Sequence, residues 1–372
     1  MKIIINQKLL IKSLKLCNSI ADNFKNTPTY LSTLIEVKDN EINFISTNGS
    51  ISVKSTIKKN NEINILNTGK VLVKTKTFFA IISKLKNESL ILEKVDNSVL
   101  KIKGNTFNSN INIMDEQIYP AINFDYQEWK ELIINPIVFK KAFSKIRHAI
   151  SNNKEKVSVM NGIYFNSNTK NKCLEIIGTD SYKLAYYQYK SDFNDYKIII
   201  DVSVIEIFLD LLDFDTNIKV FLSNNNIIFK IDDIIIASKI IEGEYPNIAK
   251  IIAIPRENRV LVSKKELIDA LDRGNVLSSL EKKSIVKLTF NQKTIEVYFN
   301  NIDLGNSKEE IACKSTIEKS TSILLNTNYL LSIIKVFDND EICIEFQDNV
   351  KPLAIKDLKD ENFLQLLVPL RG

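Results

Sequence analysis

An internal repeat is the feature that most constrains the fold of this chain. The tripeptide Ile118-Tyr119-Pro120 has a counterpart in Glu244-Tyr245-Pro246, and the two prolines lie 126 positions apart. That spacing is about one domain length, and a chain of 372 residues is too long for a single hydrophobic core. The repeat therefore predicts one folded unit built three times, with domains over residues 1–128, 129–256 and 257–372.

Each third of the chain repeats one order of elements: a helix, strands, a second helix and further strands. Apolar residues recur at helical spacing over residues 8–20, 139–150 and 264–273, and again over residues 78–85, 204–211 and 330–337. Strand-like runs bounded by Asn, Asp and Gly cover residues 34–37, 41–46, 89–93, 162–165, 173–177, 227–231, 286–290, 294–299 and 342–346. We expect an α+β fold in which each domain packs two helices on antiparallel sheets.

The two halves of each third also look alike, which gives six related units. Six such units could close into a ring or stack into a solenoid, and periodicity alone does not choose between the two. A monomeric repeat scaffold that binds peptides or nucleic acid is therefore the main alternative to a ring. The molecular mass in solution would distinguish them.

The charge of the chain is modest for its length. The formal net charge is +5, with basic residues exceeding acidic ones by five in the first third and by two in the second, and falling short by two in the last. A domain that reads DNA sequence is usually more strongly basic. The charge distribution therefore disfavours base-specific DNA recognition.

Cysteine spacing and hydropathy indicate the cellular compartment in which the chain is expected to act. Cys17, Cys173, Cys313 and Cys343 are far apart, without a Cys-x-x-Cys pair, so we predict reduced structural thiols instead of a zinc site or disulfides. No run of 18 apolar residues occurs, and an amphipathic pattern follows the first five residues in place of a signal-peptide core. We expect a cytoplasmic protein without a metal, a cofactor or membrane contact.

Catalytic chemistry has little support in the sequence. His148 is the only histidine, and it lies in a Lys-rich helical stripe without a supporting motif. No glycine-rich phosphate loop is present. Asp180 stands close to Tyr182 and Lys183, but no paired carboxylate lies at a useful spacing for acid–base work. We predict that the chain is not an enzyme; the enzymatic alternative would depend on Asp180 or His148.

Three segments carry a family resemblance. Met160-Asn161-Gly162, followed by residues 178–185, matches the patterns L-N-G and A-T-D-G-H-R-L-A; residues 242–251 resemble E/D-G-x-F/Y-P-D-Y-x-x-V/I; and residues 367–371 are similar to V-M-P-M-R. These patterns, in this order, are those of the bacterial DNA polymerase III β subunit, the sliding clamp. The resemblance runs through essentially the whole chain.

The resemblance implies a non-catalytic accessory subunit of a DNA-directed DNA polymerase, which acts as a processivity factor in DNA replication. Two chains would join head to tail as a homodimer, and their six domains would close a ring around double-stranded DNA, with helices inside and sheets outside. Phosphate attraction is independent of sequence and permits sliding. The implied partners are the DNA polymerase III catalytic subunit, an ATP-driven clamp loader and other proteins that carry a clamp-binding motif.

Three functional surfaces follow from the resemblance. Basic side chains are expected in the DNA channel at Lys8, Lys12, Lys15, Lys25, Lys76, Lys84, Lys141, Lys145 and Arg147. Dimer contacts are expected at Phe107, Ile111, Val276 and Leu277. A peptide-binding pocket is expected from Thr179, Tyr182, Lys183, Leu184, Pro246, Lys250, Ile251, Val350, Pro352, Leu366, Leu367, Val368, Pro369, Leu370 and Arg371.

Each surface has a plainer alternative. Any one of the lysines could be ordinary solvated surface, and Val276 with Leu277 could belong to a domain core. An acidic stripe of Glu206, Asp210 and Asp213 also speaks against a uniformly basic channel.

The pocket motif departs from the family pattern. Ser181, Tyr182 and Lys183 stand where the family has Gly, His and Arg, and Gly372 extends past Arg371. Loss of the glycine would restrict a turn that needs positive φ, and Lys lacks the planar fork of Arg. We therefore expect an altered peptide preference. The alternative for residues 179–184 is a plain hairpin turn with an Asp cap.

Overall fold

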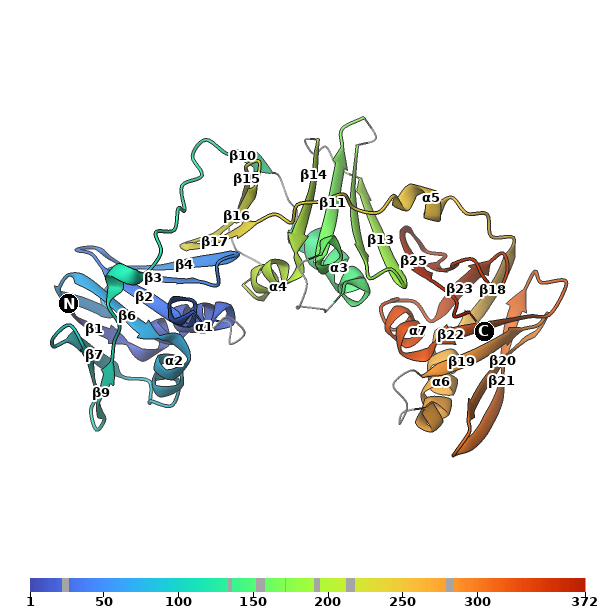
Figure 1. The fold of residues 1–372 in the computed structure, drawn as a ribbon, viewed down its shortest axis with the longest axis horizontal. Coiled ribbons are helices and arrows are strands. Elements are labelled where there is room, and N and C mark those ends of the chain that lie inside the picture. Colours follow the sequence, from blue (N-terminus) through green and yellow to red (C-terminus); the bar gives the residue numbers. More distant parts are fainter. Residues whose placement is uncertain are drawn as a thin grey trace. The chain divides into compact units, whose positions relative to one another are not determined.

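A computed structural model of the chain describes residues 1–21, 27–132, 136–151, 158–170, 172–190, 195–211, 218–278 and 284–371. The chain divides into two compact units, and Figure 1 labels the helices and strands of both. Unit 1 comprises residues 1–134 and 203–240, and unit 2 comprises residues 135–202 and 241–372. Each unit combines helices with antiparallel sheets, as the sequence predicts.

Unit 1 contains two antiparallel sheets. Its helices are α1 (Gln7–Ile20), α2 (Thr75–Ser83), α4 (Val202–Asp210) and the 3-10 turns η1 (Pro28–Leu31) and η2 (Glu116–Ile118). Its strands are β1 (Lys2–Asn6), β2 (Ser32–Val37), β3 (Glu41–Thr47), β4 (Ile51–Lys58), β5 (Ile63–Asn67), β6 (Gly69–Lys74), β7 (Ser89–Lys94), β8 (Val99–Lys103), β9 (Asn108–Asn112), β10 (Lys130–Leu132), β15 (Ile218–Leu222), β16 (Asn226–Ile231) and β17 (Ile234–Lys239). The sheet orders are β5-β1-β7-β8-β9 and β10-β15-β16-β17-β4-β3-β2-β6.

Unit 2 contains one sheet of 12 strands in the order β14-β11-β12-β13-β25-β24-β23-β18-β21-β20-β19-β22. Its helices are α3 (Pro136–Ile146), α5 (Ile248–Ile252), α6 (Lys264–Ser278), α7 (Thr327–Ile334) and the 3-10 turns η3 (Arg147–Ala149) and η4 (Val159–Asn161). Its strands are β11 (Gly162–Asn168), β12 (Cys173–Thr179), β13 (Lys183–Lys190), β14 (Tyr196–Asp201), β18 (Asn258–Ser263), β19 (Ile285–Phe290), β20 (Thr294–Asn301), β21 (Gly305–Ser315), β22 (Thr321–Asn326), β23 (Glu341–Phe346), β24 (Leu353–Asp357) and β25 (Asp360–Leu367).

Helix α1 shows how local sequence fixes the elements. The Asn6 side chain accepts a hydrogen bond from the backbone N–H of Lys8 and so caps the helix N-terminus. Leu10, Leu14 and Cys17 are fully buried on one face. The Gln7 amide donates to the carbonyl oxygen of Ile82 at 2.9 Å, which ties the start of α1 to the end of α2.

The two Tyr-Pro segments that mark the predicted repeat make the same kind of contact in the structure. The Tyr119 hydroxyl donates to the carbonyl oxygen of Ile45 on β3 at 3.1 Å, and the Tyr245 hydroxyl donates to that of Ile177 on β12 at 3.4 Å. The two Tyr-Pro segments therefore anchor equivalent connections to equivalent strands. The helix predicted over residues 139–150 ends as α3 at Ile146 and continues as the turn η3.

The sheets run without a break between successive repeats. In unit 1, β4 pairs with β17, and Ser52 lies opposite Ala237. In unit 2, β13 pairs with β25, and Leu184 lies opposite Leu366. Because these ladders join strands of different thirds, the compact units do not coincide with the thirds of the sequence.

Candidate functional site

An apolar surface lies where β13 meets β25 in unit 2. Ile177, Leu184, Leu366 and Ala354 form a buried cluster with Ile248 of the short helix α5. Tyr245, Ile251 and Ile252 pack against this cluster and remain partly exposed. We call this region the junction surface; it consists of the ends of β13 and β25, helix α5 and the C-terminal tail.

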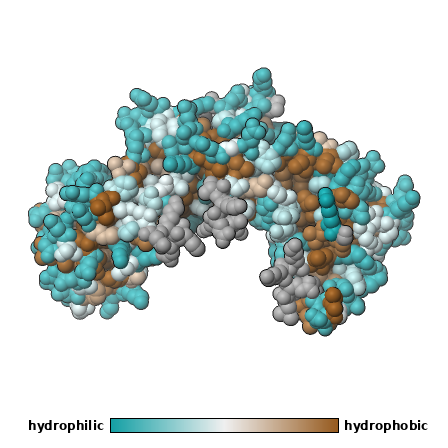
Figure 2. All heavy atoms as spheres, viewed as in Figure 1, coloured by the Kyte–Doolittle hydropathy of each residue, from teal (hydrophilic) through white to brown (hydrophobic). Residues whose placement is uncertain are grey.

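Exposed apolar side chains border the junction surface. Tyr182 is 56% exposed, Val350 is 64% exposed and Val368 is 37% exposed. Figure 2 shows apolar side chains gathered at the surface of unit 2 over β25. The tail is held by backbone hydrogen bonds from Val368 to Tyr182 and from Leu370 to Leu324, at 2.9 and 2.8 Å. Large apolar groups that stay exposed beside a fixed backbone are typical of a surface that receives a partner.

The turn between β12 and β13 is shaped by its own side chains. The Thr179 hydroxyl donates to the carbonyl oxygen of Lys183 at 2.7 Å and accepts from the N–H of Ser181. The Asp180 carboxylate accepts from the N–H groups of Tyr182 and Lys183. Asp180 is therefore engaged in the turn, as the plainer interpretation of this motif requires. Ser181 has φ +77°, the left-handed region in which glycine is at ease.

A buried polar network lies beneath the junction surface. The Lys183 ammonium donates to the carbonyl oxygen of His148, lies 3.6 Å from Asp180 and stands 4.8 Å from the ring centre of Tyr329. Burial lowers the pKa of Lys183, and Asp180 opposes this shift. The Lys183 charge is thus held inside the fold and is not part of an exposed rim.

His148 is held as a neutral side chain in this network. The Gln365 amide nitrogen donates to the carbonyl oxygen of Lys145 at 3.0 Å, so its oxygen faces His148 Nε2 at 3.1 Å and accepts from it. Nδ1 of His148 is buried without a hydrogen-bond partner in the described part of the chain. Burial, reinforced by the Lys183 charge, lowers the pKa of His148 to about 4.

The residues predicted for the peptide pocket converge on the junction surface at different depths. The buried members are Thr179, Lys183, Leu184, Leu366, Leu367 and Pro369. The half-buried members are Pro246, Ile251, Pro352 and Leu370. The exposed members are Tyr182, Lys250, Val350, Val368 and Arg371. The buried group forms the base and the exposed group the border.

The basic residues predicted for the channel are mostly exposed on helices. Lys8, Lys12 and Lys15 are exposed on α1, and Lys76 and Lys84 are exposed on and just after α2. Lys141 is exposed on α3, and Arg147 is half-buried and has interaction partners. Lys25 lies outside the described residues, as does Asp213 of the acidic stripe.

Lys145 requires a correction, because its side chain is only 3% exposed. Its ammonium lies 3.1 Å from Asp360, 3.3 Å from Asp338 and 4.5 Å from the ring centre of Phe363. The Asp360 and Asp338 carboxylates balance this charge, and the Phe363 ring adds a cation–π contact. Lys145 is therefore a structural cation and does not belong to an exposed basic stripe.

The residues predicted for the dimer interface lie at an edge strand of unit 1 and near the C-terminal end of helix α6 of unit 2. Ile111 and Phe107 are half-buried on and before β9, the edge strand of the five-stranded sheet. Val276 on α6 is 68% exposed, and Leu277 next to it is half-buried. The exposure of Val276 shows that its side chain does not belong to a domain core, which was the alternative for this residue.

Sequence reasoning missed a second free edge. Strand β21 pairs with β20 along residues 305–312, whereas β18 pairs with β21 only at residues 313–315. The other edge of residues 305–312 is unpaired within the described chain. By the internal repeat, this segment corresponds to β4 and to β13, whose edges are covered by β17 and β25.

Comparison with known proteins assigns the chain to a family. Residues 1–123, 133–247 and 251–371 match the family descriptions of the N-terminal, central and C-terminal domains of the DNA polymerase III beta subunit. The Beta sliding clamp of Mycoplasma genitalium is 31% identical over 386 residues, covering 100% of both chains. The DNA polymerase III beta chain of Streptococcus pneumoniae has a TM-score of 0.92 at 22% identity, again over 100% of both chains.

A clamp from C. crescentus, solved with polyethylene glycol at a proposed beta-motif tethering region, has a TM-score of 0.91 at 20% identity and covers 100% of both chains. The fold is that of a three-domain DNA clamp. The chain belongs to the DNA polymerase III beta subunit family, and its function is that of a sliding clamp in DNA replication.

Two further observations concern only the described residues. None of their helices has the length and apolar character needed to cross a bilayer. Among them, no group of three or more His, Cys, Asp or Glu side chains is arranged to hold a metal ion.

Proposed function

We propose that two copies of the chain join head to tail into a closed ring around duplex DNA and act as the processivity factor of the replicative polymerase. The match of three successive clamp-domain families along the chain is the observation that carries this proposal. Those matches also support three domains near residues 1–128, 129–256 and 257–372. The protein would act in the cytoplasm as an accessory subunit without catalytic activity of its own.

The free strand edges support the head-to-tail arrangement. Two of the three equivalent strands, β4 and β13, are each covered by the last strand of the following repeat, namely β17 and β25. The third, residues 305–312 of β21, would be covered by β9 of a second chain, because β9 is the corresponding last strand of the first repeat. Phe107 and Ile111 on one chain would then approach Val276 and Leu277 on the other, and both unpaired edges would be satisfied.

Sequence-independent attraction to DNA would come from the exposed lysines. Lys8, Lys12 and Lys15 form one stripe on α1, while Lys76, Lys84 and Lys141 extend the basic surface to other helices. Phosphate contacts of this kind are weak and interchangeable, so a ring can slide while its topology prevents release. Lys145 is left out of this set, because its charge is buried as well as paired, whereas Lys141 stays exposed although it lies 3.9 Å from Asp360.

The junction surface would receive peptides from partner proteins. Its buried apolar base and exposed border suit Leu or Phe side chains of a short linear motif, with backbone groups fixing the peptide direction. The DNA polymerase III catalytic subunit, the clamp loader ATPase and other motif-bearing proteins would compete for it.

Retention on circular DNA tests the ring. The protein is loaded by a clamp loader onto a nicked plasmid, freed from unbound protein by gel filtration, and half of the sample is cut once with a restriction enzyme. We expect retention on the circles and loss from the linear DNA, since only the ends allow escape. Equal retention on both forms would contradict encirclement; linear DNA blocked at both ends is the control that should keep the protein.

A further inference from the structure

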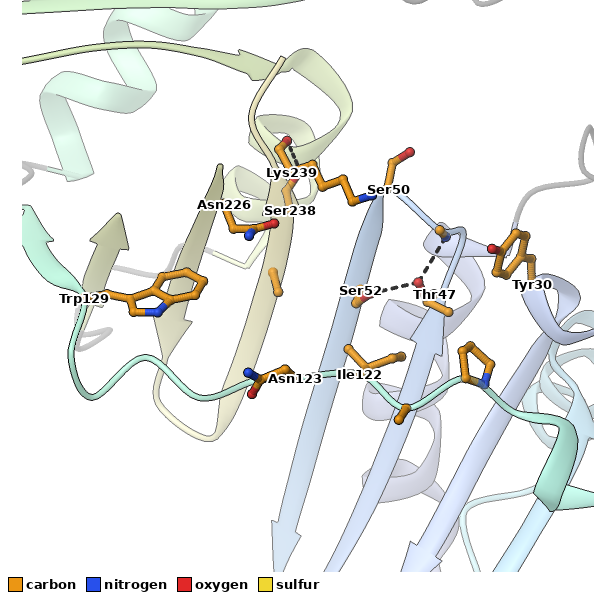
Figure 3. A pocket seen from close by; sticks show the side chains of 14 residues that line it. Tyr30, Thr47, Ser50, Ser52, Ile122, Asn123, Trp129, Asn226, Ser238 and Lys239 are labelled. Atoms are coloured by element: carbon orange, nitrogen blue, oxygen red, sulfur yellow. Dashed lines mark hydrogen bonds between the residues drawn. The ribbon is translucent and has the colours of Figure 1, made fainter. Parts of the chain in front are cut away.

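A pocket in unit 1 repeats the geometry of the junction surface with a different lining. It has a volume of about 350 Å³ and lies beside the β4–β17 ladder, under the connection that leads away from Pro120 (Figure 3). Thr47, Ser52 and Ile122 line it, with Trp129 at one end and Lys239 at the C-terminal end of β17. We call it the first-junction pocket.

The two sites are built on the same turn. The Thr47 hydroxyl donates to the carbonyl oxygen of Ile51 at 3.0 Å and accepts from the N–H of Gly49, as Thr179 does with Lys183 and Ser181. The Asn48 side chain accepts from the N–H groups two and three residues on, as that of Asp180 does. Gly49 has φ +88°, matching the +77° of Ser181.

The strand register places matching residues at the base of both sites. Ser52 follows Thr47 by five residues and lies opposite Ala237; Leu184 follows Thr179 by five residues and lies opposite Leu366. Two leucines at the second junction are thus replaced by serine and alanine at the first. Smaller side chains open space at the base, and the hydroxyl makes that space polar.

The charge of one lining residue and two unpaired backbone N–H groups indicate what kind of ligand the pocket can bind. Lys239 is exposed and is the only Lys, Arg, Asp or Glu among the residues that line the pocket. Its ammonium has no ion-pair partner within the described chain. Beside it, the connection through Ala121 and Ile122 lies outside any helix or strand (Figure 3), and within the described chain the N–H groups of these two residues make no backbone hydrogen bond. Backbone N–H groups that are unpaired in this way can bind the carbonyl oxygens of an extended peptide.

We propose that the first-junction pocket binds a short extended peptide that carries a carboxylate side chain. The peptide backbone pairs with the connection at residues 121–122, the carboxylate meets Lys239, and small or polar side chains enter the space over Ser52 and Ala237. A volume of about 350 Å³ accommodates roughly two or three residues. The sliding clamp would then hold polar acidic segments at one junction and apolar motifs at the other.

Trp129 provides a specific reporter, because it is the only tryptophan of the chain and lines the pocket. The full-length protein is titrated with the capped peptide acetyl-Ala-Asp-Ala-Asp-Ala-amide while tryptophan emission is recorded. We expect a saturable change that the Asn-containing counterpart, and sodium acetate at matched carboxylate concentration, do not produce. The absence of saturation, or equal responses to the three titrants, would overturn the proposal.

Two variants test the assignment of contacts. K239Q should weaken binding by about fivefold, as expected for one exposed ion pair. A237L introduces the residue found at the matching position of the second junction, fills the base and should weaken binding by about tenfold or more. Unchanged affinity in both variants would refute the site.

Two controls separate this site from other effects. Lys86 is an exposed lysine of unit 1 that does not line the pocket, so K86Q should bind like the unaltered chain. V350E alters the junction surface of unit 2 and should leave the Trp129 response unchanged. These controls therefore distinguish an error in the first-junction pocket from an error in the peptide site proposed for the junction surface.

Discussion

At the scale of single residues, the turn between β12 and β13 shows how this clamp tolerates a departure from the family motif. Ser181 occupies a position with φ +77°, which glycine tolerates and serine does not favour. The turn nevertheless forms, since Thr179 and Asp180 together bind three backbone N–H groups around it. The sequence predicted this conflict because the family places glycine there.

Replacing Ser181 by glycine should stabilise the protein. Glycine removes the crowding of the β-carbon at positive φ, and this gain exceeds the added freedom of the unfolded chain. We expect S181G to raise the free energy of unfolding by about 0.5 kcal/mol in urea titrations followed by circular dichroism. S181A keeps the β-carbon and is the matched control. A glycine variant no more stable than the alanine variant would contradict the argument.

Acid should weaken the fold through His148. Its pKa is about 4 in the folded chain, against 6.5 for an unperturbed histidine, so the unfolded state binds more protons between these values and stability falls as the pH drops through that window. Relative to H148Q, the free energy of unfolding should fall by about 2 kcal/mol between pH 7 and pH 4.5.

Comparison with H148Q isolates one group, because His148 is the only histidine and the carboxylates are common to both proteins. Denaturant titrations at a series of pH values provide the measurement. Parallel curves for the two proteins would show that His148 does not carry the effect.

At the scale of elements, periodicity predicted most helices and strands but not their partners. The helices over residues 8–20, 204–211 and 330–337 correspond to α1, α4 and α7, with ends shifted by a few residues. Local spacing could not reveal that β25 lies against α3. For this reason the sequence pattern places Lys145 in a basic stripe, although Asp360 and Phe363 of β25 enclose its charge.

The junction surface was predicted in outline from motifs far apart in the sequence. The motifs did not indicate which of these side chains are buried. Lys183 and Leu367 belong to the buried base, while Val350 stays exposed. Depth depends on which side chains the neighbouring strands bring near. That information is absent from a local pattern.

The border of the junction surface should control peptide affinity. Val350 is 64% exposed, so V350E leaves the core intact but adds a charge where an apolar motif is expected to bind. The affinity for the C-terminal peptide of the DNA polymerase III catalytic subunit, measured by fluorescence polarisation, should fall by about tenfold. V95E, at a valine that is 61% exposed in unit 1, is the control. Equal losses in both variants would count against the site.

At the scale of the whole molecule, the junction that joins successive repeats is missing its partner at two places in the described chain. Residues 305–312 of β21 and strand β9 correspond to pairs that are joined elsewhere in the chain. A closed ring of two chains would repeat the same junction at every position. Sequence periodicity left ring and solenoid open, and the family assignment favours the ring.

An acidic residue on α6 should separate the two chains. V276D places a carboxylate in the proposed interface, where it would lose water without gaining a partner. Light scattering should give a mass near 42.6 kDa for this variant and near twice that value for the unaltered chain. I137D, at an isoleucine that is 72% exposed on α3, should stay dimeric. A dimeric V276D protein would reject this interface.

The continuous ladder between β4 and β17 bears on how the polypeptide can be cut into pieces. A fragment that stops at residue 128 would lack β17. The backbone amide and carbonyl groups along residues 51–55 of β4 would then have no hydrogen-bond partner on that side. Such unpaired groups recruit other chains and lead to precipitation. Fragments intended for crystallisation or binding assays should therefore follow strand pairing, and keep residues 203–240 together with the N-terminal portion, instead of following the thirds of the sequence.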